Sequence, residues 1–259
     1  MKILVCVKQV PDSCETLHIH EPTGWIANLP SAVFRMNRFD EFAVEESLLI
    51  KERLPGTVAH ALSVGPKRVN STIRRALEMG ADHGIHILYP DAGYISPYTV
   101  ATLITTYART KDYDLILAGI MAEDDMACQT GQLIAALMDL PYTTSVISSE
   151  IDDEAGEIVV GREIEGGRRL MVRFELPAVL TIQSGINTPR YPSLSNVMRA
   201  RSQQHEVIRA EDLGIPQVRE TCAGLRLPDS ASMGTFIEGS PREKARKMIQ
   251  VLHEKAFLP

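Results

Sequence analysis

Apolar, β-prone runs alternate with helical patterns along the first 150 residues, and this alternation limits the possible folds more than any other feature. Each run is short and bounded by Gly, Pro or Asp; the runs are Ile3–Val7, Val58–Val64, Ile85–Tyr89 and Leu115–Ala118. Strands separated by helices form βαβ units, and the strands of such units pair in parallel. We therefore expect a doubly wound α/β fold, with a mostly parallel sheet covered by helices on both faces.

Three stretches between these runs show the periodicity of amphipathic helices. In the stretch 42–52, apolar residues recur near the helical period, and the charged residues predicted on the opposite side are Glu45, Glu46, Lys51 and Glu52. The stretch 69–79 ends before Gly80, a residue typical of helix C-caps. The stretch 100–107 follows Ser96 and Pro97, which suit an N-cap and a first helical turn.

The pattern changes beyond residue 150. Short alternating runs around 152–156 and 165–167 predict β-hairpins. The run Val172–Ile182 predicts a further strand, in which Pro177 is tolerated only at a sheet edge or at the strand start.

The chain beyond Ala200 is more polar and only loosely patterned, and a last helix is predicted from Ser240 and Pro241 to about Phe257. A polar arm of this kind more often wraps a partner than folds alone. We therefore expect residues 1–200 to form the α/β core with its hairpins, and residues 201–259 to form an arm and helix that pack on a partner.

Composition excludes several classes of protein. The net charge of −6 gives no reason to expect a nucleic-acid partner, and no apolar run approaches the ~20 residues that span a bilayer. The start of the chain is predicted to be a strand rather than a signal peptide. The four cysteines have no C-x-x-C spacing, which favours a reduced, cytoplasmic compartment and argues against a metal site or a disulfide.

A loop after the strand 115–118 leads to a helix that begins near Thr130. Unpaired amides and the positive dipole end at a helix start form an anion site. The alternative is that Asp124, Asp125 and Thr130 only cap this helix. Spacing alone favours the capping interpretation, because the loop lacks a G-x-G-x-x-G or Walker pattern and its three acidic residues repel phosphate.

The segment 161–200 carries the most specific pattern of the chain. Its characteristic residues are Arg162, Glu165-Gly166-Gly167, Pro177, Thr181, Asn187, Pro189-Arg190-Tyr191, Leu194, Asn196, Met198, Arg199 and Ala200. It resembles the signature region of the electron transfer flavoprotein β subunit family, and it departs from that family at Leu170, where Glu or Gln is usual. The resemblance covers roughly residues 1–215.

The resemblance implies that the loop binds adenosine monophosphate (AMP), largely through backbone amides. The loop residues that match the family are Ala122, Asp124, Asp125, Gln129, Thr130, Gly131 and Gln132, and the implied contacts elsewhere are Cys6, Asn37, Arg38, Phe39, Asp40 and Val64. Ile120, Met121 and Glu123 depart from the family loop. A flavin-bifurcating branch binds a second flavin adenine dinucleotide (FAD) in this cleft; it favours a D-G-D-T-x-Q-V-G-P loop, and this chain has no Gly after Asp125.

The resemblance also implies an electron carrier rather than an enzyme. Such a β subunit forms a heterodimer with an α subunit that holds most of the FAD, and the heterodimer carries electrons from flavin-dependent dehydrogenases, such as acyl-CoA dehydrogenases, to a quinone-linked or other acceptor. The residues implied in docking are Arg190, Tyr191, Leu194, Met198 and Arg199. The alternative for Leu194 is that it folds back on its own sheet.

A second class of function stays open from the residues alone, namely a stand-alone adenine-nucleotide-binding protein that acts as a sensor or resembles a hydrolase. No nucleophile, base and orienting group can be assembled from sequence neighbours. His18 and His20 alternate beside Glu21, but this spacing more often marks a solvated face than a metal site. The sequence therefore predicts neither catalytic nor metal-binding residues.

Overall fold

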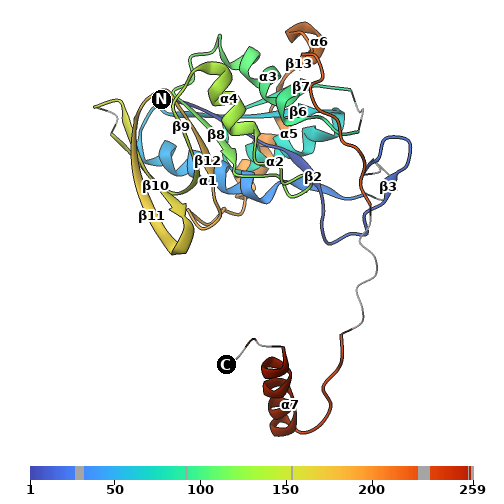
Figure 1. The fold of residues 1–259 in the computed structure, drawn as a ribbon. Coiled ribbons are helices and arrows are strands. Elements are labelled where there is room, and N and C mark those ends of the chain that lie inside the picture. The colour runs from blue at the N-terminus through green and yellow to red at the C-terminus, as the bar shows by residue number, and fades with distance from the viewer. Residues whose placement is uncertain (27–31, 91–92, 153, 227–233, 256, 258–259) are drawn as a thin grey trace. The chain divides into compact units, whose positions relative to one another are not determined.

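The computed structural model describes residues 1–26, 32–90, 93–152, 154–226, 234–255 and 257, and it confirms the α/β fold (Figure 1). The described strands of the main sheet are β1 Lys2–Cys6, β6 Val58–Gly65, β7 His83–Leu88, β8 Leu115–Gly119, β9 Tyr142–Asp152, β10 Glu157–Ile164, β11 Arg168–Glu175, β12 Ala178–Ile182 and β13 Glu206–Arg209. Two small antiparallel pairs join β2 Gln9–Pro11 to β5 Phe34–Met36, and β3 Ile19–His20 to β4 Trp25–Ile26.

The strand order is β11-β10-β9-β12-β8-β1-β6-β7-β13. Within this order, the neighbouring strands of the run β9-β12-β8-β1-β6-β7-β13 all pair in parallel. Only the β9–β10 and β10–β11 pairs are antiparallel. The chain runs outward from β1 to β6 and β7, then returns to β8 on the other side of β1. This reversal makes a topological switch point between β1 and β8, where open α/β sheets bind ligands at the carboxyl ends of their strands.

Helices cover both faces of the sheet. The described helices in the part of the chain that holds the sheet are α1 Arg38–Arg53, α2 Asn70–Met79, α3 Pro97–Ala108, α4 Thr130–Met138, α5 Leu194–Ser202 and α6 Ala210–Leu213. The remaining described helix, α7 Pro241–Glu254, belongs to a separate unit of the chain. Ile3 and Val5 of β1 pack in the apolar cluster that α1 and α2 share, whereas Leu4 belongs to the cluster of α3 and α4. This two-residue alternation is what a strand buried on both faces requires.

The predicted helix ends are confirmed. Gly80 ends α2 with a φ of 138°, and its N–H bonds to the carbonyl oxygens of Ala76 and Leu77. At the start of α3 the Ser96 hydroxyl accepts a hydrogen bond from Thr99 N, and Pro97 occupies the first turn. Because each cap matches its expected residue, these boundaries follow from local chemistry alone.

Three expectations differ from the structure. Glu45 and Glu46 are 3% and 4% exposed rather than on a solvent face, because the loop near residue 190 covers that side of α1. The run Val172–Ile182 is divided between β11 and β12, with Pro177 just before β12. The strand β9 begins at Tyr142, before the expected change at residue 150; it pairs in parallel with β12 from Tyr142 and antiparallel with β10 from Val146.

The described chain divides at a different place from the expected residue 200. One compact unit comprises Met1–Leu225 and the other Arg226–Pro259. Residues beyond 200 remain in the first unit because β13 adds to the edge of the main sheet beside β7. The packing of the later residues on a partner stays a prediction. None of the described helices combines the length and apolarity needed to cross a membrane.

Candidate nucleotide-binding site

A cleft lies at the carboxyl ends of β1, β6 and β8, beside the switch point of the sheet. The residues predicted at this site that line it are Cys6, Asn37, Asp40, Val64, Ala122, Asp124, Asp125, Gln129 and Thr130. Four predicted residues do not line it and lie one or two positions from lining residues in sequence: Arg38, Phe39, Gly131 and Gln132. The topology thus gathers segments from distant parts of the chain around one hollow, as expected for an α/β ligand site.

The start of α1 fixes the loop that follows β8. The Asn37 side chain donates to Met121 O at 2.8 Å and accepts from Glu123 N at 3.2 Å. Asp40 accepts hydrogen bonds from Lys8 N at 2.7 Å and Gly119 N at 3.0 Å. These contacts tie the ends of β1 and β8 to one helix, so the walls of the cleft form a connected set.

Asp40 is a titratable group of the cleft. Burial raises the pKa of its carboxyl to about 7, although the hydrogen bonds from Lys8 N and Gly119 N favour the charged form. The same burial, with Asp40 as a neighbouring charge, raises the pKa of the Cys6 thiol. Cys6 is therefore a protonated wall residue of the cleft, suited to packing against a flat ring.

Lys8 is the main residue of the site that sequence reasoning missed. Its ammonium group lies 2.7 Å from an oxygen of Asp124 and 2.9 Å from an oxygen of Asp125. Burial lowers the pKa of Lys8, but the two carboxylates outweigh burial and hold it above its ordinary value. Its position directly after an apolar run, at a strand's carboxyl end, is the signal that marks such a residue.

The acidic loop therefore repels phosphate less than its sequence indicates. Glu123 forms an ion pair with Arg35 at 3.0 Å, and Lys8 serves both Asp124 and Asp125. All three carboxylates have a cationic partner within the chain. The objection that three acids repel phosphate is correspondingly weakened.

The start of α4 completes the cleft. The N-cap residue Gln129 makes no side-chain capping bond among the described residues. Asp124 and Asp125 accept hydrogen bonds from Asp125 N and Ala127 N of their own loop, both at 3.0 Å, rather than from the first turn of α4. A Cβ at Gly131 would lie 2.3 Å from the Thr181 side chain, so only glycine lets α4 approach β12 this closely. Gln132 secures the preceding turn by donating to Cys128 O at 2.8 Å. Backbone amides at this start are thus available to an anion.

Two features of the wall fit a purine. Gln9 is buried and donates to Arg68 O and Ser71 Oγ, whereas its Oε1 has no hydrogen-bond partner among the described residues. A buried acceptor of this kind requires a donor, and the adenine amino group is one. Trp25 and Tyr94 also line the cleft, with their ring centroids 4.9 Å apart. Their flat apolar faces suit an aromatic ligand.

A second surface lies at the start of α5. Tyr191, Leu194 and Met198, which are predicted to dock a partner and are called the docking surface below, are 93%, 77% and 64% exposed. Leu194 is the first residue of α5, and the N-cap Ser193 accepts a hydrogen bond from Asn196 N at 3.2 Å. The alternative that Leu194 folds back on its own sheet is wrong, because most of its side chain faces solvent.

The two arginines beside this surface have partners within the chain. Arg190 binds Glu45 and Glu52, and Arg199 donates to Leu77 O at 3.0 Å and Ala81 O at 3.2 Å. Direct contact of either arginine with another protein stays a prediction. Among the described residues, no group of three or more His, Cys, Asp or Glu side chains is arranged to hold a metal ion.

The sequence is similar to known proteins along most of its length. The model of the electron transfer flavoprotein domain matches residues 30–213. The electron transfer flavoprotein subunit beta of Bos taurus is 39% identical over 218 residues, which cover 83% of this chain and 84% of the relative. The subunit beta of Methylophilus methylotrophus is 32% identical over 262 residues, which cover 98% of each of the two chains. The subunit beta of Bacillus subtilis (strain 168) is 30% identical over 262 residues, which cover 99% of each. The chain therefore belongs to the electron transfer flavoprotein family and, within it, to the β subunits.

Proposed function

We propose that this chain is the β subunit of a heterodimeric electron transfer flavoprotein. The heterodimer carries electrons between flavin-dependent dehydrogenases, such as acyl-CoA dehydrogenases, and a quinone-linked or other acceptor. The observation that carries the proposal is that one α/β unit of this family combines a cleft at its switch point with an exposed apolar docking surface. A stand-alone nucleotide sensor has no use for the second feature.

The cleft holds AMP in this proposal. The amides at the start of α4 face the phosphate, and the walls around Cys6 and Val64 pack against adenine. Lys8 neutralises part of the acidic loop and keeps it in place. AMP undergoes no electron transfer; it stabilises the native β subunit because it binds the folded state alone.

FAD, held mainly by the α subunit, accepts and donates the electrons. The residues of this chain bind and orient; none is assigned a catalytic role. Exposed apolar side chains support packing against the α subunit: Leu170 and Met171 on β11, and Met248, Ile249 and Val251 on α7. The four cysteines are free thiols, which supports a reduced, cytoplasmic location.

The test is to purify the chain with its α subunit and to measure flavin and adenylate released from each heterodimer. One FAD and one AMP for each yellow heterodimer are expected. Two FAD molecules without adenylate would replace the proposal by the flavin-bifurcating alternative. A colourless protein that does not associate with the α subunit would support the stand-alone nucleotide-binding alternative.

A further inference from the structure

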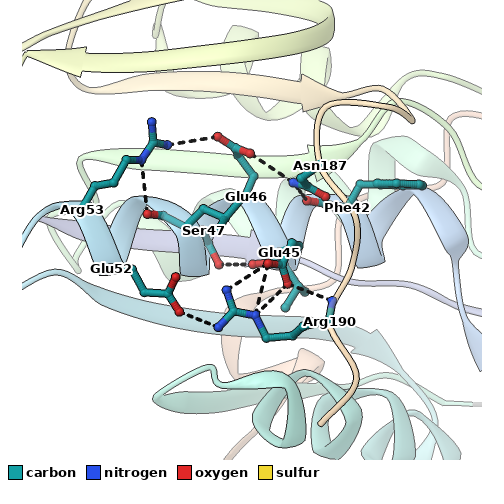
Figure 2. A network of polar contacts seen from close by, with 10 residues as sticks. Phe42, Glu45, Glu46, Ser47, Glu52, Arg53, Asn187 and Arg190 are labelled. Atoms are coloured by element: carbon teal, nitrogen blue, oxygen red, sulfur yellow. Dashed lines mark hydrogen bonds and ion pairs between the residues drawn. The ribbon is translucent and has the colours of Figure 1, made fainter.

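The segment that carries the docking surface is held on α1 by a polar network (Figure 2). The Arg190 guanidinium donates to Glu45 through Nε, at 3.1 and 2.9 Å from its two oxygens, and through Nη2 at 2.9 Å. The backbone N of Arg190 donates to Glu45 Oε2 at 3.1 Å. Its Nη1 lies 2.5 Å from Glu52 Oε1. Side chain and backbone of one residue thus bind the same helical carboxylate.

A second anchor lies three residues earlier. Asn187 donates through Nδ2 to Phe42 O and to Glu46 Oε2, both at 3.0 Å. Glu46 also accepts from Ser149 Oγ at 2.6 Å and pairs with Arg53 at 3.4 Å. The segment is therefore attached to α1 at two successive points, as Figure 2 shows.

The burial of Glu45 shows what this attachment requires. A carboxylate with a side chain only 5% exposed is costly unless paired and hydrogen-bonded. A planar guanidinium satisfies both oxygens at once, whereas an ammonium group acts as a point charge. The hydrogen bonds with Glu45, then those with Glu52, raise the pKa of Arg190. Its charge is thereby matched by carboxylates of its own chain and is poorly placed to attract a partner.

We propose that Arg190 is a positioning residue for docking: the fork of hydrogen bonds from its guanidinium to Glu45 sets the direction in which Leu194 faces the partner dehydrogenase. This inference rests on the proposed function, since it needs docking through Leu194. Leu194 follows Arg190 by four residues, and Pro192 fixes one backbone angle between them. A surface held in its bound conformation loses less entropy on association. Arg190 thus acts through geometry, not through long-range attraction.

The test uses the heterodimer as the substrate of a flavin-dependent dehydrogenase, with KM and kcat measured at several ionic strengths. Arg190→Lys keeps the charge and removes the fork. It is expected to raise KM about three- to tenfold, with kcat, flavin content and the salt dependence of KM unchanged. Wild-type KM in this variant would overturn the inference, as would a lower melting temperature with an unchanged KM.

Two further variants separate the inference from the proposed function. Leu194→Ala should raise KM, and Arg190→Lys combined with Leu194→Ala should be no worse than Leu194→Ala, because the orientation of an absent side chain has no effect. A normal KM for Leu194→Ala would overturn the docking role itself. Additive effects would show that Arg190 contacts the partner independently, contrary to the inference.

A matched pair on α1 tests the same contact from the helix side. Glu45→Gln leaves the fork one acceptor oxygen and should raise KM in the same direction. The side chain of Glu52, the second partner of Arg190, is 57% exposed. Glu52→Gln should therefore leave KM unchanged, because exposed pairs contribute little. Equal effects of the two variants would contradict the inference, and Glu45→Gln supplies the test if Arg190→Lys does not fold.

Discussion

The cleft and the docking surface draw on different parts of α1. At its start Asn37 and Asp40 organise the walls of a hollow, whereas Glu45 and Glu46 further along hold the segment before Leu194. In the cleft a single lysine serves two carboxylates. At the loop each buried carboxylate has a hydrogen-bonded partner, and Tyr191, Leu194 and Met198 present large apolar side chains to solvent. Charge changes should therefore affect the cleft most, and changes of apolar contact should affect docking most.

The largest effect is expected from Thr130→Glu, which should abolish nucleotide binding in the cleft and leave docking intact. The new carboxylate lies at the start of α4, where it repels phosphate, so the purified heterodimer should contain no adenylate. Its melting temperature should fall, since a ligand at 100 times its Kd stabilises a protein by about 2.7 kcal/mol. Acid extraction and thermal unfolding measure the two results, and KM for the dehydrogenase should stay near wild type.

Thr106→Glu is the matched control, because Thr106 lies on an exposed position of α3. It should leave both adenylate content and melting temperature unchanged. Full adenylate content in Thr130→Glu would show that the phosphate does not bind at the start of α4.

Leu194→Ala should affect docking and spare the cleft. Loss of a buried leucine contact costs about 2 kcal/mol, equivalent to about a thirtyfold rise in KM for the dehydrogenase. Adenylate content, flavin content and melting temperature should stay near wild type, because Leu194 is 77% exposed. Val207→Ala, an exposed truncation on β13, is the control and should leave KM unchanged. A loss of adenylate in Leu194→Ala would remove the contrast between the two regions.

The pH dependence of stability should report on Asp40 in the first turn of α1. The pKa of Asp40 rises from 3.8 to about 7 on folding, so the native state keeps a proton that the unfolded state releases. The contribution of Asp40 to stability therefore falls as pH rises through that window. Asp40→Asn should flatten this part of the profile in urea unfolding of the nucleotide-free protein. Parallel profiles would show that Asp40 ionises in its ordinary range.

The sequence was sufficient to predict the architecture, because strand runs and helix caps are local signals. Val58–Val64 and Gly80 became β6 and the end of α2 with little change. The cleft residues followed from the rule that ligands bind at strand ends, combined with the family resemblance. Lys8 lies at such an end too, but its two partners are more than 110 positions away, and nothing local indicates that pairing.

The face of α1 was mispredicted for the same reason. Glu45 and Glu46 carry charge, so helical periodicity assigned them to the polar side. Their burial depends on Arg190 and Asn187, which lie about 140 positions later in the chain. Periodicity separates apolar from polar residues, but it cannot identify a carboxylate that a distant arginine will cover.

The smallest effect provides a direct signal from the cleft. The chain contains one tryptophan, Trp25, whose ring contacts Tyr94 in the cleft wall. A purine that stacks on this wall should lower indole fluorescence, so adding AMP to heterodimer depleted of adenylate should give a saturable decrease. Leu194→Ala should titrate like wild type, and Thr130→Glu should give no change. A decrease caused by the dehydrogenase instead of AMP would mean that the docking surface reaches the cleft, and the two regions would then have to be treated as one site.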